Sequence, residues 1–422
     1  MQVAIITIGT RGDIQPYIAL GQGLQAAGYE VKVVTFQAFE SFVRSSGLDF
    51  AAVSGDLASL MTMDWTQSQI ESGGKSMGSL GRVAQDAEGL LVQLMTDCLQ
   101  ACQGAEVVMG SVVGGLAGQA VAQKLGVSYW SVYLQPLDRT IAFPNSFSLF
   151  PMPPRWLLVG KRAYNWTTHV FSARLFWLLF GKVLNRARQK ALHLAAFSRK
   201  QRYPTLYGYS PTVLPKPANW DERITVTGYW FLDQAETWEP PGALEQFLAS
   251  GAPPISIGFG SMAGRSAKKV LPLFLEAAFR SGQRVVLLAK REDVEGLEMS
   301  ENVFCIESVP HDWLFPRMAA VVHHGGAGTT GAAFRAGVPQ IVLPFIADQH
   351  FWAQRIAELG VGPEPLKHKK LSVEQALQAV RTVMQDKAML KRAGKLGEQV
   401  QQEHGVEEAV QAFGRAMRQA SE

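Results

Sequence analysis

Short apolar runs alternate with longer segments of helical period along the first half of the chain. The apolar runs, which predict strands, occupy residues 3–8, 31–36, 106–110 and 128–133. The segments with apolar positions at helical spacing occupy residues 16–27 and 115–125, and Gly28 ends the first of them. Strand, helix and strand in this order predict a βαβ unit. We therefore predict an α/β domain whose ligands lie beyond the carboxyl ends of its strands.

The same alternation begins again in the second half. Predicted strands occupy residues 255–260, 284–289, 303–306, 319–322 and 339–343. An amphipathic helical pattern follows the first of them at residues 268–280, and a charged helical tail spans residues 372–420. Residues 236–254, which lie between two proline pairs, predict an interdomain linker with one short helix. Two similar sheet domains in one chain imply a cleft between them.

Two segments of the first half do not fit the alternation. Residues 64–81 are polar and rich in glycine and serine, which predicts a surface loop. Residues 155–199 predict a long helical region in which aromatic side chains alternate with Lys and Arg. Two interpretations of that region stay open. In the first, it packs as an ordinary helix with a basic outer face. In the second, it forms an apolar acceptor pocket or a surface that contacts a membrane.

Composition narrows the class of protein without naming a ligand. The chain has 422 residues, is 47% hydrophobic and 18% charged, and carries a net charge of +4. This is a globular composition that does not call for nucleic acid. Cys98, Cys102 and Cys305 form no disulfide framework, so we predict reduced cysteines in a cytoplasmic protein. The chain opens directly on a core strand, without the basic region of a signal peptide, and no apolar run reaches the length of a membrane span.

A glycine-rich turn follows the predicted strand at 319–322. It contains His323, His324 and the run Gly325-Gly326-Ala327-Gly328-Thr329, and a helical pattern begins at Thr329. Glycines let the backbone approach a phosphate, and the free N–H groups of a helix's first turn point at it. His324 can add a neutral donor, or a cation if its pKa is raised. The alternative is a plain turn with threonine caps.

Two further patterns point to the same edge of the second sheet. Asp348 and Gln349 follow the strand at 339–343, and a carboxylate beside an amide suits the vicinal hydroxyls of a sugar. The alternative for Asp348 is a helix N-cap. A second glycine loop, at residues 258–262, would line the same crevice, and Trp313 would stack on a nucleobase or belong to the core. A phosphate site beside side chains that bind sugar hydroxyls suggests that the ligand is a nucleotide sugar.

Five motifs in this order resemble the sterol glucosyltransferases. They are GTRGDIQPY at 9–17, TGYWF at 227–231, GFGS at 258–261, VPHDWLFP at 309–316 and HHGGAGTTG at 323–331. That family belongs to the UDP-sugar-dependent glycosyltransferases with two Rossmann-like domains, whose bacterial relatives glycosylate antibiotics. The resemblance implies the GT-B fold: an acceptor-binding domain at 1–228 and a donor-binding domain at 229–422. Both would be doubly wound and would face a central cleft, with the terminal helix, about 405–422, packing back on the first domain.

The resemblance also implies roles for individual residues. Trp313 would stack on the uracil, Asp348 and Gln349 would read the sugar, and no metal would be required. The diphosphate would be held by Ser261, His324, Gly326, Ala327, Gly328 and Thr329, and Gly12 would also bind the donor. Aromatic residues of the long helical region would line the acceptor site, namely Trp156, Trp166, Phe171, Phe176 and Trp177.

Asp13 is the candidate general base. Many relatives place a histidine after the first strand, but this chain has no histidine before His169, and the loop offers Asp13 instead. A helix N-terminus and Arg11 nearby predict a low pKa for its carboxyl, which weakens a base. The alternative is that Asp13 only caps the helix.

These expectations combine into an inverting transferase. It would move glucose from UDP-glucose to the hydroxyl of a sterol or sterol-like lipid and form a β-glycoside, with no permanently bound cofactor. We expect a cytoplasmic monomer that touches a membrane peripherally and binds no nucleic acid. The rivals are a transferase for polyketide or glycopeptide products, a catalytically silent nucleotide-binding partner protein, and an epimerase on the same scaffold.

Overall fold

The computed structural model divides into two compact units. The first contains Met1–Leu232 and His404–Glu422, and the second contains Asp233–Glu403. The structure describes residues 1–55, 80–148, 160–197, 202–260, 264–297, 299–421, except for the side chains of 80–87, 264–267 and 420–421. The predicted loop at 64–81 therefore lies almost wholly outside the described residues.

The first unit is built on a sheet of seven parallel strands. Its strands are β1 (Gln2–Ile6), β2 (Glu30–Phe36), β3 (Asp49–Val53), β4 (Val107–Gly110), β5 (Ser128–Tyr133), β6 (Thr205–Tyr207) and β7 (Ile224–Val226). Their order in the sheet is β3-β2-β1-β4-β5-β6-β7. The order reverses direction between β1 and β4, which makes this pair the switch point of a doubly wound sheet. The loop after β1, which carries Asp13, begins at that point.

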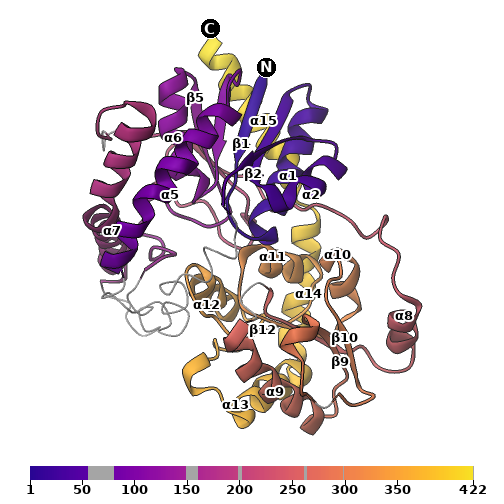
Figure 1. The fold of residues 1–422 in the computed structure, drawn as a ribbon. Coiled ribbons are helices and arrows are strands. Elements are labelled where there is room, and N and C mark those ends of the chain that lie inside the picture. The colour runs from indigo at the N-terminus through magenta and orange to yellow at the C-terminus, as the bar shows by residue number, and fades with distance from the viewer. Residues whose placement is uncertain (56–79, 149–159, 198–201, 261–263, 298, 422) are drawn as a thin grey trace. The chain divides into compact units, whose positions relative to one another are not determined.

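Helices cover both faces of this sheet (Figure 1). They are α1 (Arg11–Ala26), α2 (Glu40–Ser45) after the short η1 (Gln37–Phe39), α5 (Leu80–Ala101), α6 (Gly114–Leu125), α7 (Lys161–Leu192) and α15 (Gly405–Ser421). One face packs against α5, α6 and α7, where Met95, Ala117 and Val183 join strand residues in a buried cluster. α15 packs beside α1 on the other face: the ring of Phe413 lies 5.3 Å from Tyr29 and 5.1 Å from Trp130.

The second unit repeats the plan with five parallel strands. They are β8 (Ile255–Gly258), β9 (Val285–Leu288), β10 (Val303–Ile306), β11 (Ala320–His323) and β12 (Gln340–Val342), in the order β10-β9-β8-β11-β12. The switch point is between β8 and β11, where Gly258 pairs with His323. Both units therefore have the doubly wound α/β architecture that the alternation predicts.

The second unit's remaining elements are helical. They are α8 (Gly242–Ala249), α9 (Gly264–Arg280), η3 (Arg291–Asp293), α10 (His311–Leu314), η4 (Phe315–Arg317), α11 (Ala327–Arg335), α12 (Gln349–Leu359), η5 (His368–Lys370), α13 (Val373–Gln385) and α14 (Lys387–Gln401). The predicted short helix within 236–254 is present as α8. The segment is part of the second unit, however, because Leu244 of α8 is fully buried in its core beside Trp313 and Val286. The expectation of an interdomain linker at 236–254 is wrong, because the segment packs within the second unit.

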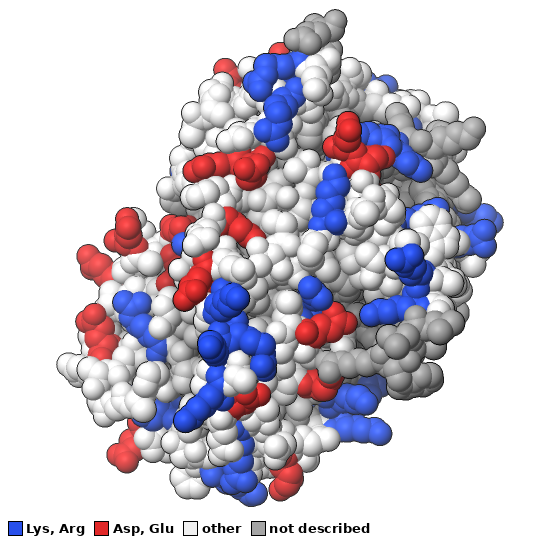
Figure 2. Space-filling view, turned by 180° about the vertical axis from the view of Figure 1, so that it is seen from behind, with Lys and Arg blue, Asp and Glu red and all other residues white. Residues whose placement is uncertain are grey.

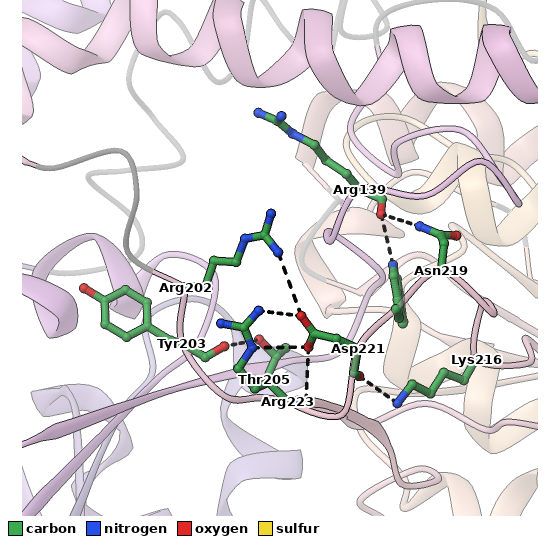
Figure 3. Close-up of polar contacts among 9 residues, drawn as sticks. Arg139, Arg202, Tyr203, Thr205, Lys216, Asn219, Asp221 and Arg223 are labelled. Atoms are coloured by element: carbon green, nitrogen blue, oxygen red, sulfur yellow. Dashed lines mark hydrogen bonds and ion pairs between the residues drawn. The ribbon is translucent and has the colours of Figure 1, made fainter.

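Polar contacts fix the chain where it enters the last two strands of the first sheet. Asp221 accepts hydrogen bonds from Arg223, Lys216 Nζ donates to the Asp221 carbonyl at 2.9 Å, and Arg202 lies 3.8 Å from the Asp221 carboxylate (Figure 3). Trp220 Nε1 donates to the carbonyl of Arg139 at 3.3 Å. The loop between β6 and β7 is thus held by ion pairs to Asp221 and by hydrogen bonds to the carbonyls of Asp221 and Arg139.

Candidate functional site

The switch point of the second sheet brings the two glycine loops together. β8 and β11 are adjacent parallel strands, so the loops that leave their carboxyl ends start side by side. Gly260 has a φ of +55°, and a Cβ placed on it would lie 3.3 Å from Cε1 of His324. A Cβ on Gly326 would lie 2.6 Å from Nε2 of the same ring. The imidazole of His324 is therefore held between the two glycines, and larger residues at either position would displace it.

Helix α11 begins at this ring. Gly326 is its N-cap, and Ala327, Gly328 and Thr329 form the first turn. Thr330 N donates to Gly326 O at 2.9 Å, but in the described part of the chain no hydrogen bond is made by the N–H groups of the three first-turn residues. A Cβ on Gly328 would meet nothing within 4 Å. The helix therefore starts two residues before the predicted Thr329, and the N–H groups of its first turn are left without a partner among the described residues.

The two adjacent histidines have different surroundings. His323 is fully buried in the sheet: Nδ1 accepts from Gly325 N at 3.1 Å and Nε2 lies 2.9 Å from Gln340 Oε1, so Nε2 carries the proton. Burial lowers the pKa of His323 to about 3. Burial also lowers the pKa of His324 to about 4, and its Nδ1 has no hydrogen-bond partner among the described residues. His324 is therefore a neutral donor at physiological pH, which decides between the two states the sequence left open.

The loop after β12 lies against the same turn. A Cβ on Gly325, whose φ is +90°, would lie 3.0 Å from the backbone oxygen of Gln349. Gln349 is buried, and its Oε1 accepts from Phe345 N at 2.8 Å and Ile346 N at 3.1 Å. Ala347 adopts a φ of +55°, a conformation that costs a residue with a Cβ about 1 kcal/mol. The hydrogen bonds to Gln349 hold the loop in this strained form.

Asp348 occupies the N-cap position of α12, but its carboxylate makes no capping hydrogen bond. Its Oδ2 accepts from Trp352 Nε1 at 3.2 Å instead. The carboxylate is thus oriented by an indole on its own helix. In Gln349 the carbonyl of the amide is occupied, whereas the described residues offer no acceptor to its NH₂ group.

Trp313 lies mostly in the core of the second unit. It is 8% exposed, its ring lies 4.9 Å from that of Trp238, and the guanidinium of Arg317 lies 4.2 Å over it. The structure therefore shows a packing role for this tryptophan. Ser261, the expected diphosphate ligand on the β8 loop, lies outside the described residues.

In the first unit, Asp13 is tied to the N-terminus of α1. Its Oδ2 accepts from Thr10 N at 2.7 Å and from Thr10 Oγ1 at 3.0 Å. No hydrogen bond reaches Oδ1 from the residues described. Asp13 thus caps the helix with one oxygen and leaves the other free. The helix begins at Arg11 rather than at Pro16, where the sequence placed it, because Thr10 and Asp13 stabilise the additional turn.

The expectation of a low pKa for Asp13 is wrong. Desolvation by the surrounding protein atoms raises the pKa, and this outweighs the two hydrogen bonds from Thr10, which lower it. The residue still has an exposed surface, as does Gly12 before it, so the carboxylate lies at the rim of the unit. A carboxylate with a raised pKa is a better proton acceptor than the sequence suggested.

The aromatic residues assigned to an acceptor site are spread along α7. Trp166, Phe171 and Phe176 are exposed, whereas Trp177 is half-buried and its ring lies 6.1 Å from that of Phe197. Trp156 lies outside the described residues. The helix was expected over 155–199, and the structure describes it over Lys161–Leu192.

The sequence assigned no individual role to three residues that shape the site. Gln340 fixes the tautomer of His323, Gly260 makes room for His324, and Ala347 carries the strain of the loop after β12. The glycine was visible as part of a loop, but a buried glutamine in a strand and a strained alanine carry no sequence signal.

Among the described residues, no three His, Cys, Asp or Glu side chains gather in a group that could hold a metal ion. No described helix is both long and apolar enough to cross a membrane.

Comparison with known proteins identifies relatives for the whole chain. Residues 3–109 match the glycosyltransferase family 28 N-terminal domain, and residues 274–414 match the erythromycin biosynthesis protein CIII-like C-terminal domain. The sterol 3-beta-glucosyltransferase of Emericella nidulans is 36% identical over 437 residues, covering 100% of this chain and 30% of the relative. That of Komagataella phaffii is 34% identical, covering 99% of this chain and 34% of the relative. The chain thus spans about a third of the length of these curated relatives.

Solved structures share the architecture. The glycosyltransferase VinC, solved in complex with DTDP, superposes with a TM-score of 0.69 at 18% identity, covering 99% of this chain and 100% of VinC. The spinosyn forosaminyltransferase SpnP gives a TM-score of 0.69 at 19% identity, with 100% of both chains covered. These likenesses establish the fold. The two matched domains and the sequence similarity along the whole of this chain make it a homologue of the sterol 3-beta-glucosyltransferases.

Proposed function

We propose that this protein is an inverting glycosyltransferase that moves glucose from UDP-glucose to the hydroxyl of a sterol or sterol-like lipid. The observation that carries the proposal is the start of α11. The N–H groups of a helix N-terminus, which have no partner in the described part of the chain, lie at a sheet switch point beside a neutral histidine whose Nδ1 has none there either. This arrangement suits the diphosphate of a nucleotide sugar.

The diphosphate would lie against Gly326, Ala327, Gly328 and Thr329. His324 would donate a hydrogen bond as a neutral imidazole, because its pKa of about 4 keeps it uncharged. Stabilisation of the leaving group would then come from the helix dipole and from hydrogen bonds, including one from the Thr329 hydroxyl. Such donors need no reorganisation when charge develops on the departing UDP.

Asp348 and Gln349 would bind the hydroxyl groups of the sugar. The carboxylate of Asp348 would accept from hydroxyl groups, and the NH₂ group of Gln349 would donate to one. Trp313 would offer the remaining accessible part of its ring to the uracil, although most of that side chain serves the core.

Asp13 would act as the base. Its Oδ1 would take the proton of the acceptor hydroxyl while the acceptor oxygen bonds to the anomeric carbon, and the bond from that carbon to the UDP oxygen would break. Attack from the face opposite UDP turns an α-linked donor into a β-glycoside. The bonds from Thr10 would orient the carboxylate through Oδ2, and the raised pKa favours proton acceptance.

The relatives named as sterol 3-beta-glucosyltransferases support the sterol acceptor and the glucosyl donor. We further propose that the protein acts as a monomer and reaches a lipid acceptor by peripheral contact with a membrane. The aromatic residues of α7 from Trp166 to Trp177 would then lie on the acceptor side or on the membrane side of the first unit.

The test is product analysis by mass spectrometry with several UDP-sugars and a sterol. We expect a product heavier than the sterol by one hexose, formed from UDP-glucose, with β stereochemistry by NMR. Asp13→Asn should lower the transfer rate about 10²- to 10⁴-fold while the circular dichroism spectrum is unchanged. UDP binding without turnover would favour the silent nucleotide-binding protein, and sugar conversion without acceptor would favour the epimerase. A wild-type rate in folded Asp13→Asn would refute the role of Asp13.

A further inference from the structure

A buried polar pair lies under the turn that precedes α11. Charged side chains are spread over the surface of the protein, as Figure 2 shows for one face, whereas His323 and Gln340 are both 0% exposed. They belong to the adjacent strands β11 and β12, and Nε2 of His323 lies 2.9 Å from Oε1 of Gln340. All other residues of the two strands are apolar. A polar pair at this place therefore needs an explanation other than packing.

The hydrogen bonds of His323 fix both the ring and the amide. Nδ1 accepts from Gly325 N at 3.1 Å, and the ring is neutral because burial lowers its pKa to about 3. A neutral imidazole carries one proton, so Nε2 must donate it and Gln340 must present its oxygen. The NH₂ group of Gln340 then has no partner among the described residues. This unsatisfied group costs folding free energy, and an apolar side chain would avoid that cost.

The hydrogen bond to Gly325 indicates what the pair does. A side chain that accepts from the N–H group two residues later forms an Asx turn, and here the imidazole takes the place of the carboxylate or amide. A Cβ on Gly325 would lie 2.9 Å from Cγ1 of Val342 and 3.0 Å from the backbone oxygen of Gln349, so the turn has little room to shift. The next residue, Gly326, is the N-cap of α11. The direction of the first N–H groups of α11 therefore depends on where this bond holds Gly325.

We propose that Gln340 and His323 are positioning residues for the diphosphate of the nucleotide. Gln340 selects the tautomer of His323 whose Nδ1 can accept, and His323 then holds the N–H group of Gly325. The start of α11 is thereby ordered before the donor binds. Both side chains are buried, so they act on the donor through the backbone. This inference rests on the proposed function, because it concerns the same α11 turn.

A glutamine suits this role better than a glutamate. A carboxylate would accept the same hydrogen bond, but its charge would raise the pKa of His323 and favour a second proton on Nδ1. A protonated ring has no acceptor left for Gly325. Two other titratable side chains act on the ring, because His324 and His311 lower the pKa of His323. The neutral amide thus keeps Nδ1 available at every physiological pH.

The experiment measures the Kd for UDP by isothermal titration calorimetry on the full chain, so it needs no acceptor and no transfer. In Gln340→Met the ring is free to adopt the other tautomer, and UDP should bind about three- to tenfold more weakly. His323→Leu offers no acceptor, and about tenfold weaker binding is expected. In His323→Asn the amide oxygen can accept from Gly325 N, so UDP should bind within about threefold of the wild type.

The double variant His323→Asn/Gln340→Met separates positioning from packing. If Gln340 acts through the ring, replacing it should change UDP binding by less than about twofold once the ring is absent. A packing role would weaken binding equally in both backgrounds, and that result would overturn the proposal. Near-UV circular dichroism checks the fold of each variant.

Gln340→Glu gives a readout that depends on pH. The ratio of its Kd for UDP to that of the wild type should rise from about 1 near pH 8 to about tenfold near pH 5.5, because the ring gains a second proton as the pH falls. The matched control is Gln375→Glu, an exposed position in the capping box of α13 where a glutamate also fits. Its ratio should stay near 1 at both pH values.

Two outcomes separate this inference from the proposed function. If the wild type binds UDP but Gln340→Met and His323→Leu bind it equally well, or if the Gln340→Glu ratio does not change with pH, the positioning role is overturned. A wild-type chain that does not bind UDP would overturn the proposed function, and this inference with it.

Discussion

Replacing Gly9 by alanine should move the carboxylate of Asp13, the proposed base, while leaving the side chain itself unchanged. A Cβ on Gly9 would lie 2.3 Å from Oδ2, 2.5 Å from Cγ and 2.6 Å from Cβ of Asp13. Carbon and oxygen atoms that are not bonded do not approach so closely, so the carboxylate must move by about 1 Å. The hydrogen bond from Thr10 N to Oδ2, 2.7 Å long, cannot survive that movement unchanged.

Two effects of different size follow from the displacement. Loss of the capping hydrogen bond should lower the free energy of unfolding by about 1 kcal/mol, and the φ of +155° at Gly9 should add about 1–3 kcal/mol of backbone strain once the residue has a Cβ. A shift of about 1 Å in a catalytic group lowers rates by about 10²-fold. Gly9→Ala should therefore reduce kcat strongly in the enzyme that remains folded, by more than its loss of stability explains.

The control is Gly28→Ala at the other end of α1. Gly28 has a φ of +89°, but nothing lies within 4 Å of an added Cβ. It should lose about 1–2 kcal/mol of stability through backbone strain and keep the wild-type kcat. Urea unfolding followed by fluorescence gives the stabilities, and steady-state transfer from UDP-glucose gives kcat. A Gly9→Ala enzyme with the wild-type kcat, or a Gly28→Ala enzyme that is equally impaired, would refute the reasoning.

Three more predictions concern other parts of the chain. Gly325→Ala should raise the KM for the donor about tenfold, because its Cβ would press on the backbone of Gln349 at 3.0 Å, and an unchanged KM would contradict that contact. Burial lowers the pKa of His169 to about 4, whereas a histidine in the unfolded chain has a pKa near 6.5. The contribution of neutral His169 to the free energy of unfolding is therefore complete above pH 6.5 and is lost as the pH falls toward 4. Unfolding at several pH values should show a shallower acid slope in His169→Gln, by roughly 1 kcal/mol per pH unit, and an identical slope would exclude the residue. Phe413→Ala should destabilise the first unit by about 3–5 kcal/mol, since its ring is fully buried; chemical denaturation measures this, and a loss below about 1 kcal/mol would count against the packing of α15.

The alternation of strands and helices was predictable because burial imposes a period on the sequence. The runs at 3–8 and 31–36 match β1 and β2 closely, since parallel strands covered on both faces are apolar throughout. Helix starts were less predictable. Both α1 and α11 begin before the apolar period does, because capping side chains and glycines carry the first turn.

The sequence was enough to predict which loops form the site. It was not enough to predict the surroundings and protonation of the individual residues. His323 and His324 are adjacent in sequence, but their surroundings differ. His323 is hydrogen-bonded to Gln340, whereas the ring of His324 lies against Gly326 at the start of α11. Strand pairing decides which side each ring takes. The protonation of Asp13 and His324 depends on how many protein atoms surround them, and local sequence does not report that number.

The placement of α15 has a consequence for how the protein is made. Its Phe413 packs between Tyr29 and Trp130, and Val406 packs against Gly23. The first unit therefore contains segments from both ends of the chain. A ribosome must translate the entire second unit before the first can close its sheet on that side. The nascent amino-terminal half would therefore wait with an apolar surface uncovered, and a chaperone that shields such surfaces would act on it during this interval.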